Sequence, residues 1–256
     1  MPVIVDVIVV DTQPKEKVWT NINAFTEVIA IVGQTTWQVM KAKKALKVDW
    51  YWDSSPESSK DHDYRLDQAL KNGKKEIARK DGDPEGTFKK AMKIIEKTYS
   101  APFLAHNTME PMNFFADVSK NKAELIGPIQ TPESMRDSIA GLLDIPYSNI
   151  SVQITRIGGG FGRRLYGNFG LEAAAISYKV GYPIQLIYSR EDDMTQGVYR
   201  PAYKVKYKAG LDKQNNLLSF AIQGVGIHGS PIFANRFPAG AISNLSLIHI
   251  PSPRDS

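Results

Sequence analysis

The sequence centres on the glycine-rich run Arg156-Ile157-Gly158-Gly159-Gly160-Phe161-Gly162-Arg163-Arg164. It follows Ser151-Val152-Gln153-Ile154-Thr155, whose alternation of apolar and polar residues predicts a half-buried strand. Residues Phe169 to Lys179 read as a helix, so we expect the glycines in a strand-to-helix turn. Because glycine lets a ligand approach the main chain, this turn would offer backbone N–H groups to an anion or an oxo group. Arg163 and Arg164 would add positive charge beside them.

The spacing of the glycines excludes two common nucleotide-binding motifs. A G-x-G-x-x-G fingerprint from Gly158 would need glycine where Arg163 stands, and one from Gly159 would need glycine where Phe161 stands. A P-loop would need Lys and Ser or Thr after a second glycine, but Arg163-Arg164-Leu165 occupies those positions. A glycine-rich turn without a ligand stays open as an alternative, since glycine runs punctuate many loops.

The composition is that of a globular protein with one large domain or two ordinary ones. The chain has 256 residues, of which 42% are hydrophobic and 23% charged. Its net charge of +5 is dispersed, and no basic stripe with interleaved aromatic residues appears, which argues against nucleic-acid binding. The sequence has no cysteine, which excludes disulfides, a cysteine-ligated zinc site and an iron–sulfur cluster held by this chain.

The two ends of the chain carry further expectations. No apolar run is as long as the about 18 residues that a membrane-spanning helix needs. Residues 1–6 lack the basic and apolar regions of a signal peptide and read as a strand entered midway, so we expect the chain to be a fragment. Residues 246–256 contain two prolines and no period, and we expect a non-native or disordered tail there.

Hydrophobic periodicity predicts an α+β (mixed α/β) fold. Strands at Val3–Val10 and Glu27–Gly33 are followed by a helix from about Thr36 to Leu46. A third strand at Leu46–Trp52 would close a β-α-β unit. Thr131 has the position of a helix N-cap. The other expected elements are helices at Tyr64–Asn72 and Thr87–Lys97, strands at Ile94–Tyr99, Phe114–Val118, Ala123–Ile126 and Ile184–Tyr188, and a paired Tyr199–Leu211 and Asn216–Gly226.

Two histidines and one glutamate are the candidates for polar chemistry outside the glycine run. His106 and Glu110 are four residues apart, but flanking prolines argue against the helix that would make them a metal-binding pair. Glu110 is as well explained by a structural role, as a buried residue that accepts hydrogen bonds from backbone N–H groups or from Arg163 or Arg164. His228 follows a strand and would line a pocket. No serine lies in a nucleophile-elbow context, so a hydrolase is weakly supported.

Three motifs occur in order between about residues 99 and 210. They are Phe103-Leu104-Ala105-His106-Asn107-Thr108-Met109-Glu110-Pro111-Met112-Asn113, the glycine run about fifty residues later, and Ser189-Arg190-Glu191-Asp192-Asp193-Met194 with Tyr199-Arg200-Pro201. This arrangement resembles the molybdopterin-binding large subunit of the xanthine dehydrogenase and aldehyde oxidase family. It looks most like the isoquinoline 1-oxidoreductase beta-subunit type.

The resemblance implies a division of the chain. Residues 1–52 would be the C-terminal part of an α/β hammerhead-like domain, and residues 53–98 a connecting segment with helices. Residues 99–245 would be the first part of the molybdopterin-binding domain, ahead of the tail at 246–256.

The resemblance also implies functional residues. In the family, a main-chain N–H at the phenylalanine of the Gly-Phe-Gly turn faces an oxo ligand of molybdenum, and here that role falls on Phe161. The implied cofactor-binding residues are Gly159, Gly160, Phe161, Gly162 and Arg163, and the substrate-pocket candidates are Arg200 and His228. No metal ligand is implied within the chain.

Three positions depart from the family pattern. Many relatives carry a glutamine where Leu104 stands, so no metal contact is carried over there. Arg163-Arg164 replaces the lysine-type continuation of the xanthine oxidases, as in the isoquinoline-type branch. Arg200 is offset by one residue from the substrate-pocket arginine of the xanthine enzymes, which argues against a purine substrate.

The resemblance implies an oxidoreductase of several parts. Its cofactor would be molybdenum–molybdopterin, with the cytosine dinucleotide form open, and its substrate an aldehyde or N-heterocycle oxidised with oxygen from water. Electrons would pass to iron–sulfur clusters on a separate small subunit, with a cytochrome as a candidate acceptor. The family's catalytic glutamate would lie beyond residue 256, so the fragment is expected to hold no catalytic residue and to be inactive alone.

Two questions stay open at this stage. The compartment is unknown, with the bacterial cytoplasm, or a periplasmic or membrane-associated place reached through further segments or partners, as the alternatives. The competing function is a non-catalytic α/β binding or scaffold domain whose glycine-rich turn is purely structural.

Overall fold

The chain folds into two compact units, each assembled from segments far apart in the sequence. The computed structural model describes residues 4–12, 27–49, 51, 58–73, 77–195, 198–227 and 242–247. Unit 1 comprises residues 1–53, 105–200 and 230–236, and unit 2 comprises residues 54–104, 201–229 and 237–256. The glycine run therefore lies in unit 1, whereas the linear domain boundaries stay a prediction.

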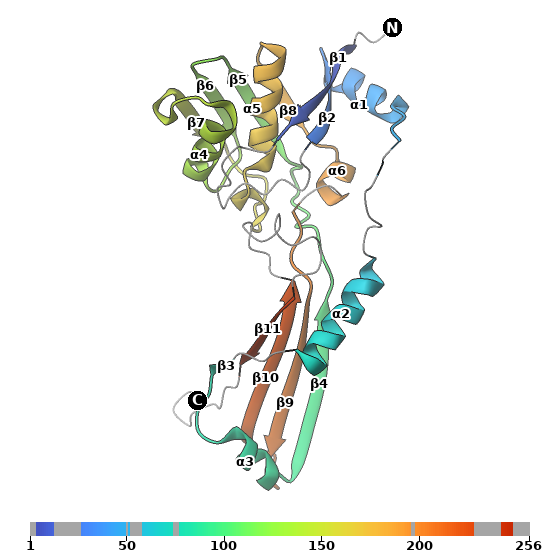
Figure 1. Ribbon diagram of the computed structural model, residues 1–256, viewed down its shortest axis with the longest axis vertical. Helices are drawn as coiled ribbons and strands as arrows, with labels where there is room; N and C mark the ends of the chain where they lie inside the picture. The colour runs from blue at the N-terminus through green and yellow to red at the C-terminus, as the bar shows by residue number, and fades with distance from the viewer. Residues whose placement is uncertain are drawn as a thin grey trace. The chain divides into compact units, whose positions relative to one another are not determined.

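A four-stranded sheet forms the centre of unit 1 (Figure 1). Its strands are, in sheet order, β7 (Ile150–Ile154), β6 (Ala123–Gly127), β5 (Asn113–Val118) and β8 (Ile184–Ile187). β5 is antiparallel to both neighbours, whereas β6 and β7 are parallel. A parallel pair needs a crossover connection, which the helix α4 (Pro132–Leu143) and a 3-10 turn at Tyr147–Asn149 supply.

The core of unit 1 lies between this sheet and the helix α5 (Asn168–Val180), which packs against β5. Phe114 of β5 and Phe169 of α5 meet edge to face, with 5.6 Å between ring centroids. Small residues such as Ala173 and Ala174 let the helix lie close to the strands, and both are completely buried. The glycine run connects β7 to this buried helix, so both ends of the turn are anchored in the core.

A second, two-stranded sheet in unit 1 also packs on α5. It pairs β1 (Ile4–Asp11) and β2 (Glu27–Gly33) in antiparallel fashion. Val10 and Ala30 of these strands belong to one buried cluster with Ala175 and Ile176 of the helix. The helix α1 (Thr36–Ala45) follows and begins with a capping box.

The expected third strand of this region is wrong. Residues 46–49 and 51 form no strand, while positions 50 and 52 lie outside the described residues. Because β1 and β2 pair only with each other in the described part of the chain, the predicted β-α-β unit does not exist.

Unit 2 is a five-stranded sheet with two helices in its connections. In sheet order its strands are β3 (Ile77–Arg79), β11 (Ile242–Leu247), β10 (Leu217–Ile227), β9 (Tyr203–Leu211) and β4 (Lys93–Ala101). The helices are α2 (Ser59–Asn72) and α3 (Pro84–Lys90). Lys204 of β9 forms ion pairs of 2.8 Å with both Asp63 and Asp67 of α2.

The fold class predicted from the sequence, α+β, is confirmed. The strand pair joined at Asp212–Asn215 is confirmed as the hairpin of β9 and β10. The helix predicted at Thr87–Lys97 is wrong in its second half, because α3 ends at Lys90 and β4 begins at Lys93. Residues 248–256 lie outside the described residues, and Ser246 and Leu247 end β11. In the described part of the chain, no helix has the length and apolar character to cross a membrane.

Candidate cofactor-binding site

The glycine run forms a turn whose backbone enters the left-handed region three times. The φ angles are +99° at Gly159, +49° at Phe161 and +88° at Gly162. Glycine adopts this conformation without steric cost, but phenylalanine does not. Strained non-glycine residues of this kind are held in place by their surroundings and cluster at functional sites. Phe161 is therefore the position at which the turn carries the strongest sign of a function.

The turn exposes polar main chain and an aromatic ring together. The backbone N–H groups of residues 159–162 donate no hydrogen bond within the described part of the chain, whereas the N–H of Gly158 and that of Arg163 do. The side chain of Phe161 is 63% exposed. A row of free N–H groups in a turn is an anion-binding feature, which agrees with the role expected for Gly159, Gly160, Phe161 and Gly162.

Glu110 holds the first glycine of the turn. Its Oε2 accepts a hydrogen bond of 2.9 Å from the N–H of Gly158, and its own N–H donates to the Gly158 carbonyl at 3.0 Å. A Cβ atom at position 158 would lie 2.4 Å from the Cβ of Glu110, so only glycine permits this approach. The hydrogen bonds predicted for Glu110 are confirmed, whereas the predicted burial is wrong, because its side chain is 36% exposed.

Arg164 ties the turn to its surroundings from the inside. Its side chain has no exposed surface and donates to the carbonyls of Gly159 at 2.9 Å and Pro128 at 3.2 Å. It also donates to the carbonyl and to the carboxylate Oε2 of Glu110, both at 2.9 Å. The guanidinium group thus neutralises a carboxylate and anchors the turn.

Arg163 also lies behind the turn and is 2% exposed. It donates to Oδ1 of Asn168 at 2.9 Å, while its Nε and one terminal nitrogen have no hydrogen-bond partner. Burial lowers its pKa, opposed by the charges of nearby groups that include Asp193 and Glu172. Its positive charge therefore acts on the turn from a buried position behind it. The assignment of Arg163 as a cofactor contact stays a prediction.

Arg163 belongs to a buried polar cluster that the sequence did not reveal. Glu172 of α5 accepts hydrogen bonds from Asn168 and from the Tyr188 hydroxyl. Burial raises the pKa of Glu172, against the lowering effect of these hydrogen bonds and of Arg163. Burial and the neighbouring carboxylate of Glu172 also raise the pKa of Tyr188. These polar side chains support the first turn of α5, which follows directly on the glycine run.

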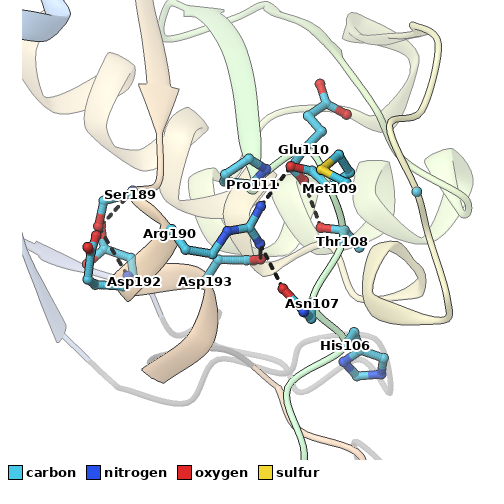
Figure 2. A network of polar contacts seen from close by, with 12 residues as sticks. His106, Asn107, Thr108, Met109, Glu110, Pro111, Ser189, Arg190, Asp192 and Asp193 are labelled. Atoms are coloured by element: carbon cyan, nitrogen blue, oxygen red, sulfur yellow. Dashed lines mark hydrogen bonds and ion pairs between the residues drawn. The ribbon is translucent and has the colours of Figure 1, made fainter.

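The first and third sequence motifs meet beside the turn (Figure 2). Arg190, at the start of α6 (Arg190–Thr195), donates to the Met109 carbonyl at 2.7 Å and to Oδ1 of Asn107 at 3.4 Å. It also forms an ion pair of 3.2 Å with Asp193 of the same helix. Two motifs about eighty residues apart are therefore joined by one guanidinium group.

The substrate-pocket candidates have different outcomes. Arg200 donates to the Phe161 carbonyl at 2.9 Å, so the structure brings it to the turn. This contact orients the peptide group that follows Phe161. His228 lies outside the described residues.

Two residues next to the turn were not among the predicted site residues. The Nδ1 of His106 lies 3.1 Å from the Val198 carbonyl, and the other edge of its ring faces Gly162. The exposed carboxamide of Gln130 lies so close to Gly160 that a Cβ there would be 2.7 Å from its Oε1. The sequence offered no signal for Gln130 beyond its place before a helix.

A groove of about 860 Å³ lies elsewhere in unit 1. β2 and α1 line one side and β8 the other, with Ile176 and Glu172 of α5 also contributing. None of the residues of the glycine run lines it. The candidate site is therefore the exposed turn itself with the side chains around it, and not this groove.

The fold and the turn define a domain that binds an anionic or oxo-bearing group through its main chain. A family model of the molybdopterin cofactor-binding domain matches residues 68–245, which is more than half of the chain. The chain belongs to this family, that of the molybdopterin-binding subunits of the aldehyde oxidases and xanthine dehydrogenases.

Individual relatives agree with this assignment. The chain is 27% identical over 203 residues to aldehyde oxidase 2 of Mus musculus, covering 77% of this chain and 15% of that protein. It is 27% identical over 161 residues to the nicotinate dehydrogenase large molybdopterin subunit of Eubacterium barkeri, covering 62% of this chain and 37% of that protein. The chain thus spans well under half the length of the relatives it matches.

A solved structure supports the fold. The aldehyde oxidoreductase from Desulfovibrio gigas aligns with a TM-score of 0.61 at 15% sequence identity. The alignment covers 84% of this chain and 27% of that one. At this identity the likeness shows the architecture alone.

The residues of the turn fit the cofactor that the family name states. The N–H groups of residues 159–162, which donate no hydrogen bond in the described part of the chain, are donors for oxo or phosphate oxygens. Three of these four residues have a positive φ. No cluster of three or more His, Cys, Asp or Glu side chains that could hold a metal occurs among the described residues. Within that part of the chain, the turn offers its main-chain N–H groups for holding the cofactor.

Proposed function

We propose that this chain forms one wall of the cofactor site of a molybdenum hydroxylase. The observation that carries the proposal is the exposed Phe161, held at φ +49° beside four backbone N–H groups that have no acceptor in the described part of the chain. When bound, molybdenum–molybdopterin supplies the redox centre for inserting a water-derived oxygen into an aldehyde or N-heterocycle. The names of the relatives, an aldehyde oxidase and a nicotinate dehydrogenase, support both substrate classes.

Each residue around the turn has a role in this proposal. The N–H groups of residues 159–162 donate to oxygen atoms of the cofactor. Arg163 adds positive charge from behind the turn, and Gln130 offers a carboxamide beside Gly160. Arg200 fixes the Phe161 carbonyl and thereby the direction of the N–H of Gly162, since carbonyl and N–H of one peptide group point in opposite directions.

The finer parts of the proposal concern the whole protein. We infer that it is of the isoquinoline 1-oxidoreductase type and that electrons pass to iron–sulfur clusters on a small partner subunit, with a cytochrome as a further acceptor. The absence of cysteine from these 256 residues agrees with clusters held elsewhere. The cytosine dinucleotide form of the cofactor, and a cytoplasmic, periplasmic or membrane-associated location, belong to the same proposal.

A pair of glycine variants tests the cofactor site. Gly162 and Gly181 have similar φ angles, +88° and +80°, and an added Cβ would clash with nothing in either place. Alanine at either position costs about 1–2 kcal/mol of backbone strain. Gly162→Ala would shift the backbone inside the candidate site. Gly181→Ala would shift it only at the end of α5, outside that site.

The measurement is molybdenum per polypeptide, by mass spectrometry, in the full-length protein purified from cells that make the cofactor. We expect metal content near one in the unaltered protein and in Gly181→Ala, and at least a threefold loss in Gly162→Ala. Equal content in the two variants would show that the turn is remote from the cofactor. No molybdenum in the unaltered protein would favour the scaffold alternative with a structural turn.

A further inference from the structure

His106 has a hydrogen-bonding state fixed by its surroundings. Its Nδ1 lies 3.1 Å from the carbonyl oxygen of Val198, and a carbonyl can only accept a hydrogen bond. Nδ1 must therefore carry the hydrogen. In a neutral imidazole the other nitrogen, Nε2, is then a hydrogen-bond acceptor with a free lone pair.

The acceptor nitrogen faces the glycine turn. A Cβ built on Gly162 would lie 3.8 Å from Nε2 and 3.9 Å from Cδ2 of His106, which are ordinary contact distances. No residue of the described part of the chain hydrogen-bonds to Nε2. Figure 2 shows the imidazole standing clear of the network that Asn107 and Met109 form with Arg190.

The groups around this nitrogen are donors and cations. The turn presents the N–H groups of residues 159–162, and Arg200 presents a guanidinium group. Burial lowers the pKa of His106, and the positive charges of Arg200 and Arg163 lower it further, against one raising contact with the Val198 carbonyl. The ring is therefore neutral at pH 7, and its lone pair is available.

We propose that Nε2 of His106 is a hydrogen-bond acceptor of the site, which takes an N–H or O–H group of the bound cofactor or of the substrate. The proposal rests on the proposed function and deepens it by assigning the direction of one hydrogen bond. Among groups that mostly donate, this acceptor favours ligands that present a donor at this point. It also explains why the histidine is tied down through Nδ1, since that contact sets both the tautomer and the ring orientation.

The first test needs no cofactor. Long-range ¹H–¹⁵N correlation spectra of the purified protein at pH 7 report which nitrogen of each imidazole carries the hydrogen, and His106→Gln identifies the signals. We expect a neutral ring protonated at Nδ1, with a pKa below 6.5. A ring protonated at Nε2, or a charged ring at pH 7, would overturn the proposal whether or not the protein holds molybdenum.

The second test uses the full-length enzyme and separates the two sources of the donor. Glutamine can replace the acceptor through its Oε1, whereas phenylalanine keeps the ring shape without an acceptor. If the cofactor supplies the donor, His106→Phe lowers bound pterin about three- to tenfold, the effect of one hydrogen bond, and His106→Gln does not. If the substrate supplies it, pterin content stays constant and KM for the aldehyde or N-heterocycle rises by the same factor in His106→Phe only.

Two outcomes would contradict the assignment. Equal pterin content and equal KM in both variants and in the unaltered protein would mean that no ligand donor reaches Nε2. Equal loss in both variants would mean that the ring acts by packing alone. A protein without any bound pterin would instead refute the proposed function, and the tautomer measured in the first test would then decide the structural part alone.

Discussion

Arg164→Lys is the sharpest test of how the turn is held. The guanidinium group donates to four acceptors on three residues. They are the carbonyls of Gly159 and Pro128, and the carbonyl and carboxylate of Glu110. Lysine has at most three donors on one atom and lacks the planar fork. We expect about two acceptors to lose their donors, each at about 1–3 kcal/mol, for a total loss of about 2–6 kcal/mol.

Urea unfolding followed by circular dichroism measures this loss. With a slope of about 2 kcal/mol per molar urea, the midpoint should fall by about 1–3 M. Arg156→Lys is the matched control, because Arg156 belongs to the same run but is exposed, and its replacement should cost less than about 0.5 kcal/mol. Equal midpoints for the two variants would refute the conclusion that Arg164 anchors the turn.

Two further variants, one in each unit, test a buried ionisable side chain. Burial keeps the pKa of Glu172 above its ordinary 4.5, so the stability that this carboxyl contributes is present below about pH 4.5 and lost as pH rises through its folded-state pKa. Urea midpoints of Glu172→Gln should therefore fall less than those of the unaltered protein between pH 4.5 and 7. In unit 2, Lys204→Ala should destabilise by about 1–2 kcal/mol, because Asp63 and Asp67 lose a buried partner but stay half-exposed to water. Lys97→Ala, exposed on β4, should leave the thermal midpoint unchanged.

Local patterns predicted most of the elements, and the failure at Leu46–Trp52 shows their limit. Apolar and β-branched residues at 46 and 48 read as a strand, but strand formation needs a neighbouring strand to pair with. β2 offers no such pairing to this segment, and Leu46 and Val48 instead line the groove between β2 and β8. Sequence periodicity reports which residues prefer burial and leaves open which strand, if any, will be their neighbour.

The start of α4 shows a correct position with a different contact. Thr131 directly precedes the helix, as predicted, but its hydroxyl makes no capping bond and donates to the Leu165 carbonyl at 2.9 Å. The N–H of Gln130 likewise donates to the Arg164 carbonyl at 3.0 Å. A residue chosen for a helix start thus joins that helix to the end of the glycine run, which no local pattern encodes.

The backbone conformation of the site could be predicted from the sequence, whereas the burial of its charged side chains could not. Glycines report directly where the main chain bends or is approached closely, so the run could be recognised as a turn that binds through N–H groups. Glu110 could be assigned a structural partner because a buried carboxylate needs donors, and the two arginines were the donors at hand. That both arginines would lie inside the protein depends on the tertiary fold, in which both guanidinium groups lie over the ring of Phe169 of α5.

The buried polar cluster behind the turn could be predicted from the sequence only in part. The predicted helix began at Phe169, so it contained Glu172 but not Asn168. In the structure α5 begins at Asn168, and the two residues, four apart, share one face of the helix. A polar pair on the buried face of an apolar helix demands partners from outside it, because leaving it unpaired costs too much. The identity of those partners, Arg163 from the turn and Tyr188 from the end of β8, follows only from the tertiary fold. The same packing that hides these four side chains therefore fixes the first turn of α5, and with it the direction in which the N–H groups of the glycine run point.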